Sequence, residues 1–86
     1  MIKVELYGVP RLRAGTGLVS LEAADVGSAM IELGRACPAL EGSVLMGDRV
    51  HPAYKLSLNG DRFVDEPGTA LLEGDVLLLL AADVGG

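Results

Sequence analysis

The sequence contains very few aromatic, cysteine and histidine residues. Its 86 residues include no tryptophan, one phenylalanine, two tyrosines, one cysteine and one histidine. Because half of the residues are hydrophobic, a folded core is expected, and it must be almost entirely aliphatic. One cysteine cannot form an internal disulfide, and with one histidine it cannot complete a structural zinc site. We therefore expect a reducing, cytoplasmic compartment.

Long apolar runs and an excess of basic residues are absent as well. The longest apolar run, residues 76–82, is much shorter than the ~20 residues of a membrane span. Residues 1–5 alternate in polarity and lack the apolar stretch of a signal peptide. Twelve acidic and seven basic residues give a net charge of -5, which repels phosphate backbones and anionic lipids. We expect a soluble protein that binds neither nucleic acid nor membrane and whose partners present basic surfaces.

The first half of the chain predicts two strands and a helix. Residues 2–7 and 18–22 are typical of strands and are separated by a turn rich in glycine and proline. Asp25 is placed to cap a helix, and apolar residues follow at helical spacing until Pro38 ends it. Gly34 weakens this helix by about 1 kcal/mol relative to alanine.

The second half predicts a loop followed by three strands. Residues 39–52 show no sustained period and are interpreted as a loop with at most one helical turn. Residues 54–58 alternate and end at Asn59-Gly60, a dipeptide typical of a tight hairpin turn into residues 62–64. Residues 76–80 are apolar on both faces, which is typical of a strand between two neighbours.

This order of elements predicts an α+β protein of the β-grasp (ubiquitin-like) class. A mixed sheet of four to five strands would curve around one main helix, with the first and last strands parallel at its centre. The length leaves room for one domain, residues 1–86, with a flexible C-terminal tail at residues 81–86.

Side chains offer few candidates for catalysis. Cys37 falls on the apolar stripe of the helix, where a thiol usually behaves as a small hydrophobe, although a nucleophile is the alternative. His51 is either a surface residue or a titrating partner contact. Acidic pairs such as Asp65 with Glu66 and Glu73 with Asp75 flank turns, where they are usually solvated rather than catalytic. No glycine-rich phosphate loop follows a strand.

The end of the sequence is the remaining feature. After the last strand the chain runs through Val84 to Gly85 and Gly86. A glycine pair extends fully and passes through a narrow channel, so it allows a carboxylate to be threaded into the active site of another protein.

Several segments together resemble a known family. The run 58–64, the turn 72–75, the apolar strand 76–80 and Gly85-Gly86 are similar to the MoaD/ThiS-like sulfur carriers, of which MoaD is the small subunit of molybdopterin synthase. The resemblance extends over nearly the whole chain. Ala81-Ala82-Asp83 differs from the family, which often has a proline-containing, apolar stretch there, and residues 41–52 match no part of the family pattern.

The resemblance implies a carrier without catalytic residues of its own. An activating enzyme of the ubiquitin-activating type would use ATP to adenylate the carboxylate of Gly86, and sulfur would then replace AMP to give a thiocarboxylate. The chain itself would bind no cofactor and no metal. Its partners would be that activating enzyme, a sulfur donor such as a cysteine desulfurase or rhodanese-like protein, and an acceptor. The acceptor expected from the resemblance is the large subunit of molybdopterin synthase, in molybdenum cofactor biosynthesis.

Partners would dock on the last strand. By analogy with ubiquitin-like folds, Leu77 and Leu79 are assigned to the core, and Leu78 and Leu80, with Phe63, to the docking face. Alternatively, both faces of the strand are covered within the chain.

Two other function classes remain open: a ubiquitin-like modifier conjugated through Gly86, and a non-covalent β-grasp binding module. The residues do not decide whether a carrier serves molybdopterin, thiazole, cysteine or tRNA thiolation.

Overall fold

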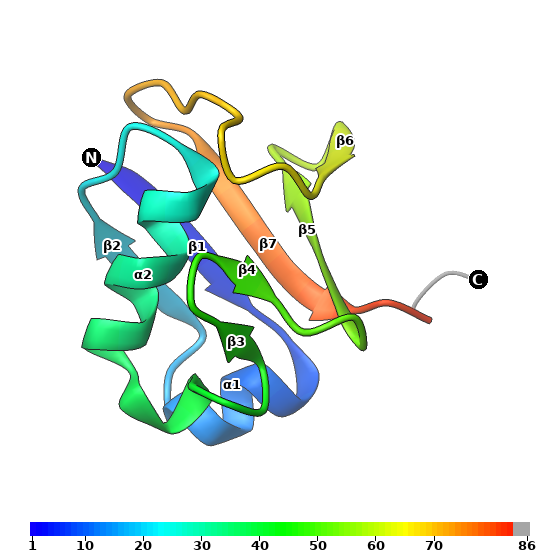
Figure 1. Ribbon diagram of the computed structural model, residues 1–86. Coiled ribbons are helices and arrows are strands. Elements are labelled where there is room, and N and C mark those ends of the chain that lie inside the picture. The colour runs from blue at the N-terminus through cyan, green and yellow to red at the C-terminus, as the bar shows by residue number, and fades with distance from the viewer. Residues whose placement is uncertain (84–86) are drawn as a thin grey trace.

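Five strands form one mixed sheet in the computed structural model, which describes residues 1–83. The strand order is β2–β1–β7–β5–β6. The bounds are β1 Ile2–Leu6, β2 Leu18–Leu21, β5 Tyr54–Leu58, β6 Arg62–Val64 and β7 Val76–Ala81. Strands β1 and β7 are parallel at the centre, and the other pairs are antiparallel. Helix α2, Val26–Ala36, crosses one face of this sheet (Figure 1). The predicted β-grasp architecture is confirmed.

The core lies between α2 and the inner face of the sheet. Alternation along β1 directs every second side chain toward the helix, and the same parity holds in β5 and β7. Helix α2 contributes Ala29, Met30 and Leu33, none of which is exposed. The buried residues that face them from the three central strands are Ile2, Val4, Leu6, Leu56, Leu58, Leu77 and Leu79. The aliphatic core expected from composition is therefore confirmed.

Both ends of α2 lie near the predicted positions. The side chain of Asp25 accepts a hydrogen bond from the backbone N–H of Ser28 at 2.8 Å, which satisfies one of the free amides of the first turn. The helix ends at Ala36, two residues before Pro38. Residues Pro38–Leu40 continue as one turn of 3-10 helix, η1, in agreement with the single helical turn allowed for this region.

The turn between β5 and β6 has the predicted backbone geometry. Asn59 and Gly60 have φ values of 56° and 72°, and both residue types tolerate this left-handed region. The Asn59 side chain also accepts a hydrogen bond from Val76 N–H at 2.8 Å and donates one to Asp75 Oδ1 at 3.0 Å. The turn is thereby fixed to the start of β7.

The segment between β1 and β2 was predicted wrongly as a turn. It contains the helix α1, Gly8–Ala14, which packs against η1 and β7. Seven residues with glycines at the boundaries carry too little periodicity to indicate a helix. Tertiary contacts stabilise it instead, and Pro10 is the residue of the helix that is buried in them.

The segment 39–52 is more regular than the predicted loop. It contains a small separate hairpin, β3 Leu45–Met46 and β4 Arg49–Val50, whose strands are too short to show a period. The last strand also includes Ala81, so it extends one residue into the predicted tail. None of the helices in residues 1–83 is long and apolar enough to cross a membrane.

Candidate docking face at the end of the last strand

The two faces of β7 differ in burial. Leu77 and Leu79 are 0% exposed and face α2, which confirms their assignment to the core. Leu78 and Leu80 point to the opposite side of the sheet and are half-buried. A strand that is apolar on both sides thus has one side covered by the helix and the other directed away from it.

A row of paired residues crosses the outer face of the sheet through Leu78. The register pairs Leu78 with Glu5 of β1 on one side and with Ser57 of β5 on the other. The row continues to Leu18 of β2 and Phe63 of β6, both of which are exposed. Paired residues on adjacent strands point to the same face. Leu78 and Phe63 therefore share the outer face, and Leu80 lies one row further along β7.

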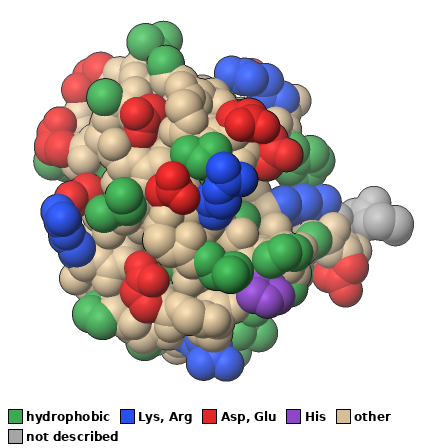
Figure 2. Space-filling view, in the orientation of Figure 1, with side chains coloured by type: hydrophobic (Ala, Val, Ile, Leu, Met, Phe, Trp, Pro, Cys, Tyr) green, Lys and Arg blue, Asp and Glu red, His purple; other side chains and the backbone are tan. Residues whose placement is uncertain are grey.

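An apolar hollow of about 480 Å³ lies on this face beside the end of β7. Leu78, Leu80 and Ala81 form one side of it, and the other residues come from the start of α1 and the start of β5. Those other residues are Tyr7, Gly8, Val9, Ala53 and Tyr54. Figure 2 views the molecule from the side of α2, so the outer face lies behind; hydrophobic side chains are visible next to the histidine, at the edge where the chain leads toward its C-terminus. The geometry is that of a surface suited to an apolar side chain of another molecule.

The segment 51–54 fixes the chain where it leaves the sheet. Ala82 N–H donates to the carbonyl of Ala53 at 2.8 Å, directly after the pairing of Ala81 with Tyr54. The imidazole of His51 accepts a hydrogen bond from Ala53 N–H through Nδ1 at 3.0 Å. The rings of His51 and Tyr54 meet edge to face, with centroids 6.4 Å apart. His51 was predicted as a loop residue, and the structure shows that it supports this exit point.

Polar groups border the hollow. The hydroxyl of Tyr7 donates a hydrogen bond to the carboxylate of Glu5, and this bond raises the pKa of Tyr7. On the far side of β7, the Nζ atom of Lys55 lies 4.3 Å from the centroid of the Phe63 ring, a cation–π geometry. The predicted docking residue Phe63 is thus 62% exposed but already contacts a cation.

The remaining candidate side chains do not form a catalytic site in residues 1–83. Cys37 is 8% exposed, and burial raises the pKa of its thiol, so it fits the core interpretation. Asp75 accepts hydrogen bonds from Leu72 N–H and from Asn59, which lower its pKa, so it stabilises a turn. The carboxylate of Glu73 pairs with the amino group of Met1. No three His, Cys, Asp or Glu residues within 1–83 are grouped as metal ligands.

Three of the predicted site residues, Val84, Gly85 and Gly86, lie outside the described residues. The structure brings Leu78, Leu80 and Phe63 to one face. Sequence reasoning missed Tyr7, Val9, Ala53 and Tyr54. The alternation of β1 carried a signal for Tyr7, because Lys3 and Glu5 share its outward parity. Val9 and Ala53 carried none, since α1 and the segment 51–54 reach the hollow only through tertiary contacts.

Comparisons with known proteins give structural neighbours only: no family model matches the sequence, and no curated protein matches it. The small archaeal modifier protein 1 (SAMP1) of Haloferax volcanii matches with a TM-score of 0.82 and 29% identity, over 99% of this chain and 98% of that one. The BexX/CysO complex of Amycolatopsis orientalis contains a chain that matches over 100% of both chains, with a TM-score of 0.81 and 19% identity. A subunit of the molybdopterin-converting factor of Helicobacter pylori, in a complex of subunits 1 and 2, matches with a TM-score of 0.66 and 21% identity, over 99% and 97%.

Proposed function

The chain has the ubiquitin-like fold of the ThiS/MoaD-like proteins, to which its structural neighbours belong, as the sequence resemblance predicted, and from this premise we propose that it is a sulfur carrier. The sulfur would be carried on the carboxylate of Gly86, the last residue of the sequence. The chain would supply recognition and reach, and its partners would supply the catalytic groups.

The chemistry proceeds in two substitutions. An activating enzyme holds ATP, and the Gly86 carboxylate attacks the α-phosphorus, so that pyrophosphate leaves and an acyl adenylate forms. Hydrosulfide from a sulfur donor then attacks the acyl carbon, and AMP leaves with the electron pair of the broken C–O bond. The product is a thiocarboxylate, which is a stronger nucleophile than the original carboxylate and transfers its sulfur to an acceptor.

The observation that carries this proposal is the position of the apolar hollow beside the end of β7. A partner that fills the hollow between Leu78, Leu80 and Tyr7 is held next to the point where the chain leaves the sheet. Gly86 is the fourth residue after Ala82 in the sequence, and four fully extended residues span at most about 14 Å. The hydrogen bond between Ala82 N–H and Ala53 O fixes the residue from which this segment starts. A partner docked in the hollow would therefore also be positioned to receive the Gly86 carboxylate.

For the acceptor we propose the large subunit of a molybdopterin synthase. The support is the sequence resemblance together with the fold shared with a subunit of the molybdopterin-converting factor. ATP would be used by the activating partner alone, and a cysteine desulfurase or rhodanese-like protein would deliver the sulfur. The three partners would use the docking face in turn.

The decisive experiment is intact mass spectrometry. The mass of the isolated protein first establishes whether the native chain ends at Gly86. The protein is then incubated with an activating enzyme from the same cell, ATP and a sulfur source, in parallel with a variant lacking Gly86. A gain of about 16 Da, sulfur in place of oxygen, is expected only with the intact terminus. An unchanged mass with a demonstrably active enzyme would contradict the carrier function and favour a non-covalent binding module.

A second candidate, a protein modifier, is supported by the 29% identity to small archaeal modifier protein 1. In that case the activated carbonyl of Gly86 would be attacked by a lysine amine of a target, and AMP or a thiol would leave. The same reaction supplemented with cell extract distinguishes the two: a modifier gives conjugates whose tryptic peptides carry Gly86 in an isopeptide bond. A carrier gives the thiocarboxylate without such conjugates.

A further inference from the structure

A second pocket of about 480 Å³ lies on the helix side of the sheet, away from the outer-face residues Leu78 and Leu80. Its inner wall is apolar and comes from three parts of the fold: Val26 and Met30 of α2, Val50 of β4, and Leu56 and Val64 of β5 and β6. The small hairpin β3–β4 stands beside α2 and forms one side of the pocket (Figure 1). The proposed function does not use this pocket.

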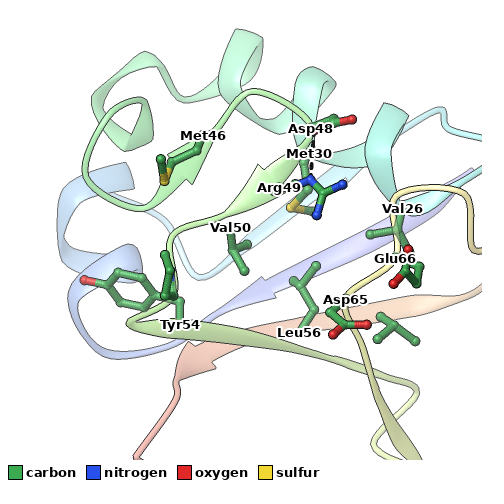
Figure 3. A pocket seen from close by; sticks show the side chains of 12 residues that line it. Val26, Met30, Met46, Asp48, Arg49, Val50, Tyr54, Leu56, Asp65 and Glu66 are labelled. Atoms are coloured by element: carbon green, nitrogen blue, oxygen red, sulfur yellow. Dashed lines mark ion pairs between the residues drawn. The ribbon is translucent and has the colours of Figure 1, made fainter.

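The pocket has two chemically different ends. Figure 3 shows Tyr54 and Met46 at one end, and Asp65 and Glu66 at the other, with Val50 between them. Met46 is 55% exposed and Tyr54 is half-buried, so the apolar end is accessible. Asp65 and Glu66 are exposed. A ligand that fits must therefore combine an apolar part with a polar head.

The charges at the polar end favour a cationic head. Three carboxylates, from Asp48, Asp65 and Glu66, line the pocket together with one guanidinium, from Arg49. Arg49 Nε lies 3.7 Å from Asp48 Oδ1, and the positive charge of Arg49 is therefore already paired with the carboxylate of Asp48. Within residues 1–83, Asp65 and Glu66 form no ion pair. Two carboxylates thus remain for a positive charge brought by a ligand.

An anionic head is disfavoured, although the N-terminus of α2 lies at this end. The first three backbone amides of the helix are already satisfied: Val26 N–H donates to Thr69 O at 3.0 Å and Gly27 N–H to Pro67 O at 2.8 Å. The third, Ser28 N–H, donates to the side chain of Asp25. The helix therefore has no free amide in this turn to offer an anion, and the neighbouring carboxylates would repel one.

We infer that this pocket is a second interaction site, which takes a lysine or arginine side chain from a basic, leucine-flanked segment of a partner protein. The aliphatic stem lies over Val50, the cationic head meets Asp65 and Glu66, and a neighbouring apolar residue of the partner contacts Tyr54 and Met46. The site differs from the outer docking face and is independent of the chemistry at Gly86. The carrier is therefore bound from two sides.

The test is a titration of the isotope-labelled protein followed by NMR. The probe is a short peptide in which leucines flank one lysine and one arginine, and the matched probe has glutamates in place of both basic residues. The basic peptide is expected to shift the amide and methyl signals of Val26, Val50 and Val64, and to bind at least about tenfold more tightly than the acidic one. Raising the salt concentration should weaken this binding.

A pair of charge-matched variants separates a local site from general attraction to an acidic protein. D65N/E66Q removes the two proposed contacts, whereas D61N/E32Q removes two carboxylates that do not line the pocket. The first double variant should weaken binding of the basic peptide about fivefold or more, and the second should leave it nearly unchanged. All four substitutions lie at exposed or half-buried positions, so both variants should fold.

Equal binding of the two peptides would overturn the inference, as would equal losses in both double variants or signal shifts confined to Leu78 and Leu80. The thiocarboxylate assay reports on Gly86 alone. A failure of one proposal therefore leaves the other standing.

Discussion

Ala82 and Ala53 are joined by a backbone hydrogen bond of 2.8 Å, in which the N–H of Ala82 donates to the carbonyl of Ala53. This bond follows the last residue of β7 and lies beside the apolar hollow. The position from which the chain continues is therefore set by the rigid sheet. A partner bound on the outer face would therefore lie beside Ala82, whose position is fixed, and the first prediction below tests this arrangement.

The first prediction concerns the outer face of β7. Leu80→Asp places a charge in the apolar hollow without disturbing the core, since Leu80 is only half-buried and points away from α2. We expect kcat/KM for adenylation by the activating enzyme to fall about tenfold or more, as is typical of central interface residues. Leu72→Asp is the matched control, because Leu72 is 72% exposed and does not line the hollow. Equal rates for the two variants would exclude the hollow as the docking site.

The second prediction compares adjacent residues of β7. Leu79→Ala removes a side chain that is 0% exposed and should lower the free energy of unfolding by about 2–5 kcal/mol. Leu78→Ala, on the other face, should cost about 1 kcal/mol or less. Urea denaturation monitored by circular dichroism measures both. Similar losses would mean that the outer face is packed as tightly as the core.

The third prediction concerns two glycines of α2. A Cβ at Gly27 would lie 2.9 Å from Pro67 Cβ and 3.2 Å from Pro67 O, so Gly27→Ala should destabilise the fold by about 1–3 kcal/mol despite its better helix propensity. A Cβ at Gly34 would meet the flexible, exposed side chain of Glu41, which is free to move aside. Gly34→Ala should therefore stabilise the protein by up to about 1 kcal/mol.

Thermal and urea unfolding of the two alanine variants test this contrast. If Gly27→Ala were neutral, the loop around Pro67 would have to move away from the first turn of α2. Such a movement would also lengthen the hydrogen bond from Gly27 N–H to the carbonyl oxygen of Pro67.

The fourth prediction concerns pH. Hydrogen bonds from Leu72 N–H and Asn59 hold the pKa of Asp75 below its ordinary value in the folded protein. A carboxylate with a lowered pKa contributes stability that is present above its unfolded-state pKa, about 4, and is lost as the pH falls through the folded-state pKa. The free energy of unfolding should therefore fall below about pH 4, and less steeply in Asp75→Asn.

Asp61→Asn is the control for this pH effect, since the Asp61 carboxylate forms no hydrogen bond or ion pair with other residues of the described chain. Urea titrations at several pH values between about 2.5 and 6 give the slopes. The same slope in the wild type and in Asp75→Asn would show that other groups cause the acid sensitivity.

Local sequence patterns determined most of the fold. Alternation specified β1 and β5, Asp25 and Pro38 marked the limits of the main helix, and the doubly apolar run at 76–80 indicated a central strand. The turn at Asn59-Gly60 was predictable because few other residue pairs accept positive φ at both positions. In each case the signal lies within a few neighbouring residues, so the sequence alone was sufficient.

The tertiary structure decided the rest. Helix α1 and the hairpin β3–β4 are too short to show a period, and their contacts with the remaining fold stabilise them. The sequence of β7 could not show whether Leu77 or Leu78 faces the core, because both are leucines. Only the position of α2, which covers Leu77, distinguishes them. Both pockets combine residues from distant parts of the chain, such as Tyr7 with Leu80 and Val26 with Val64, and no local pattern records that proximity.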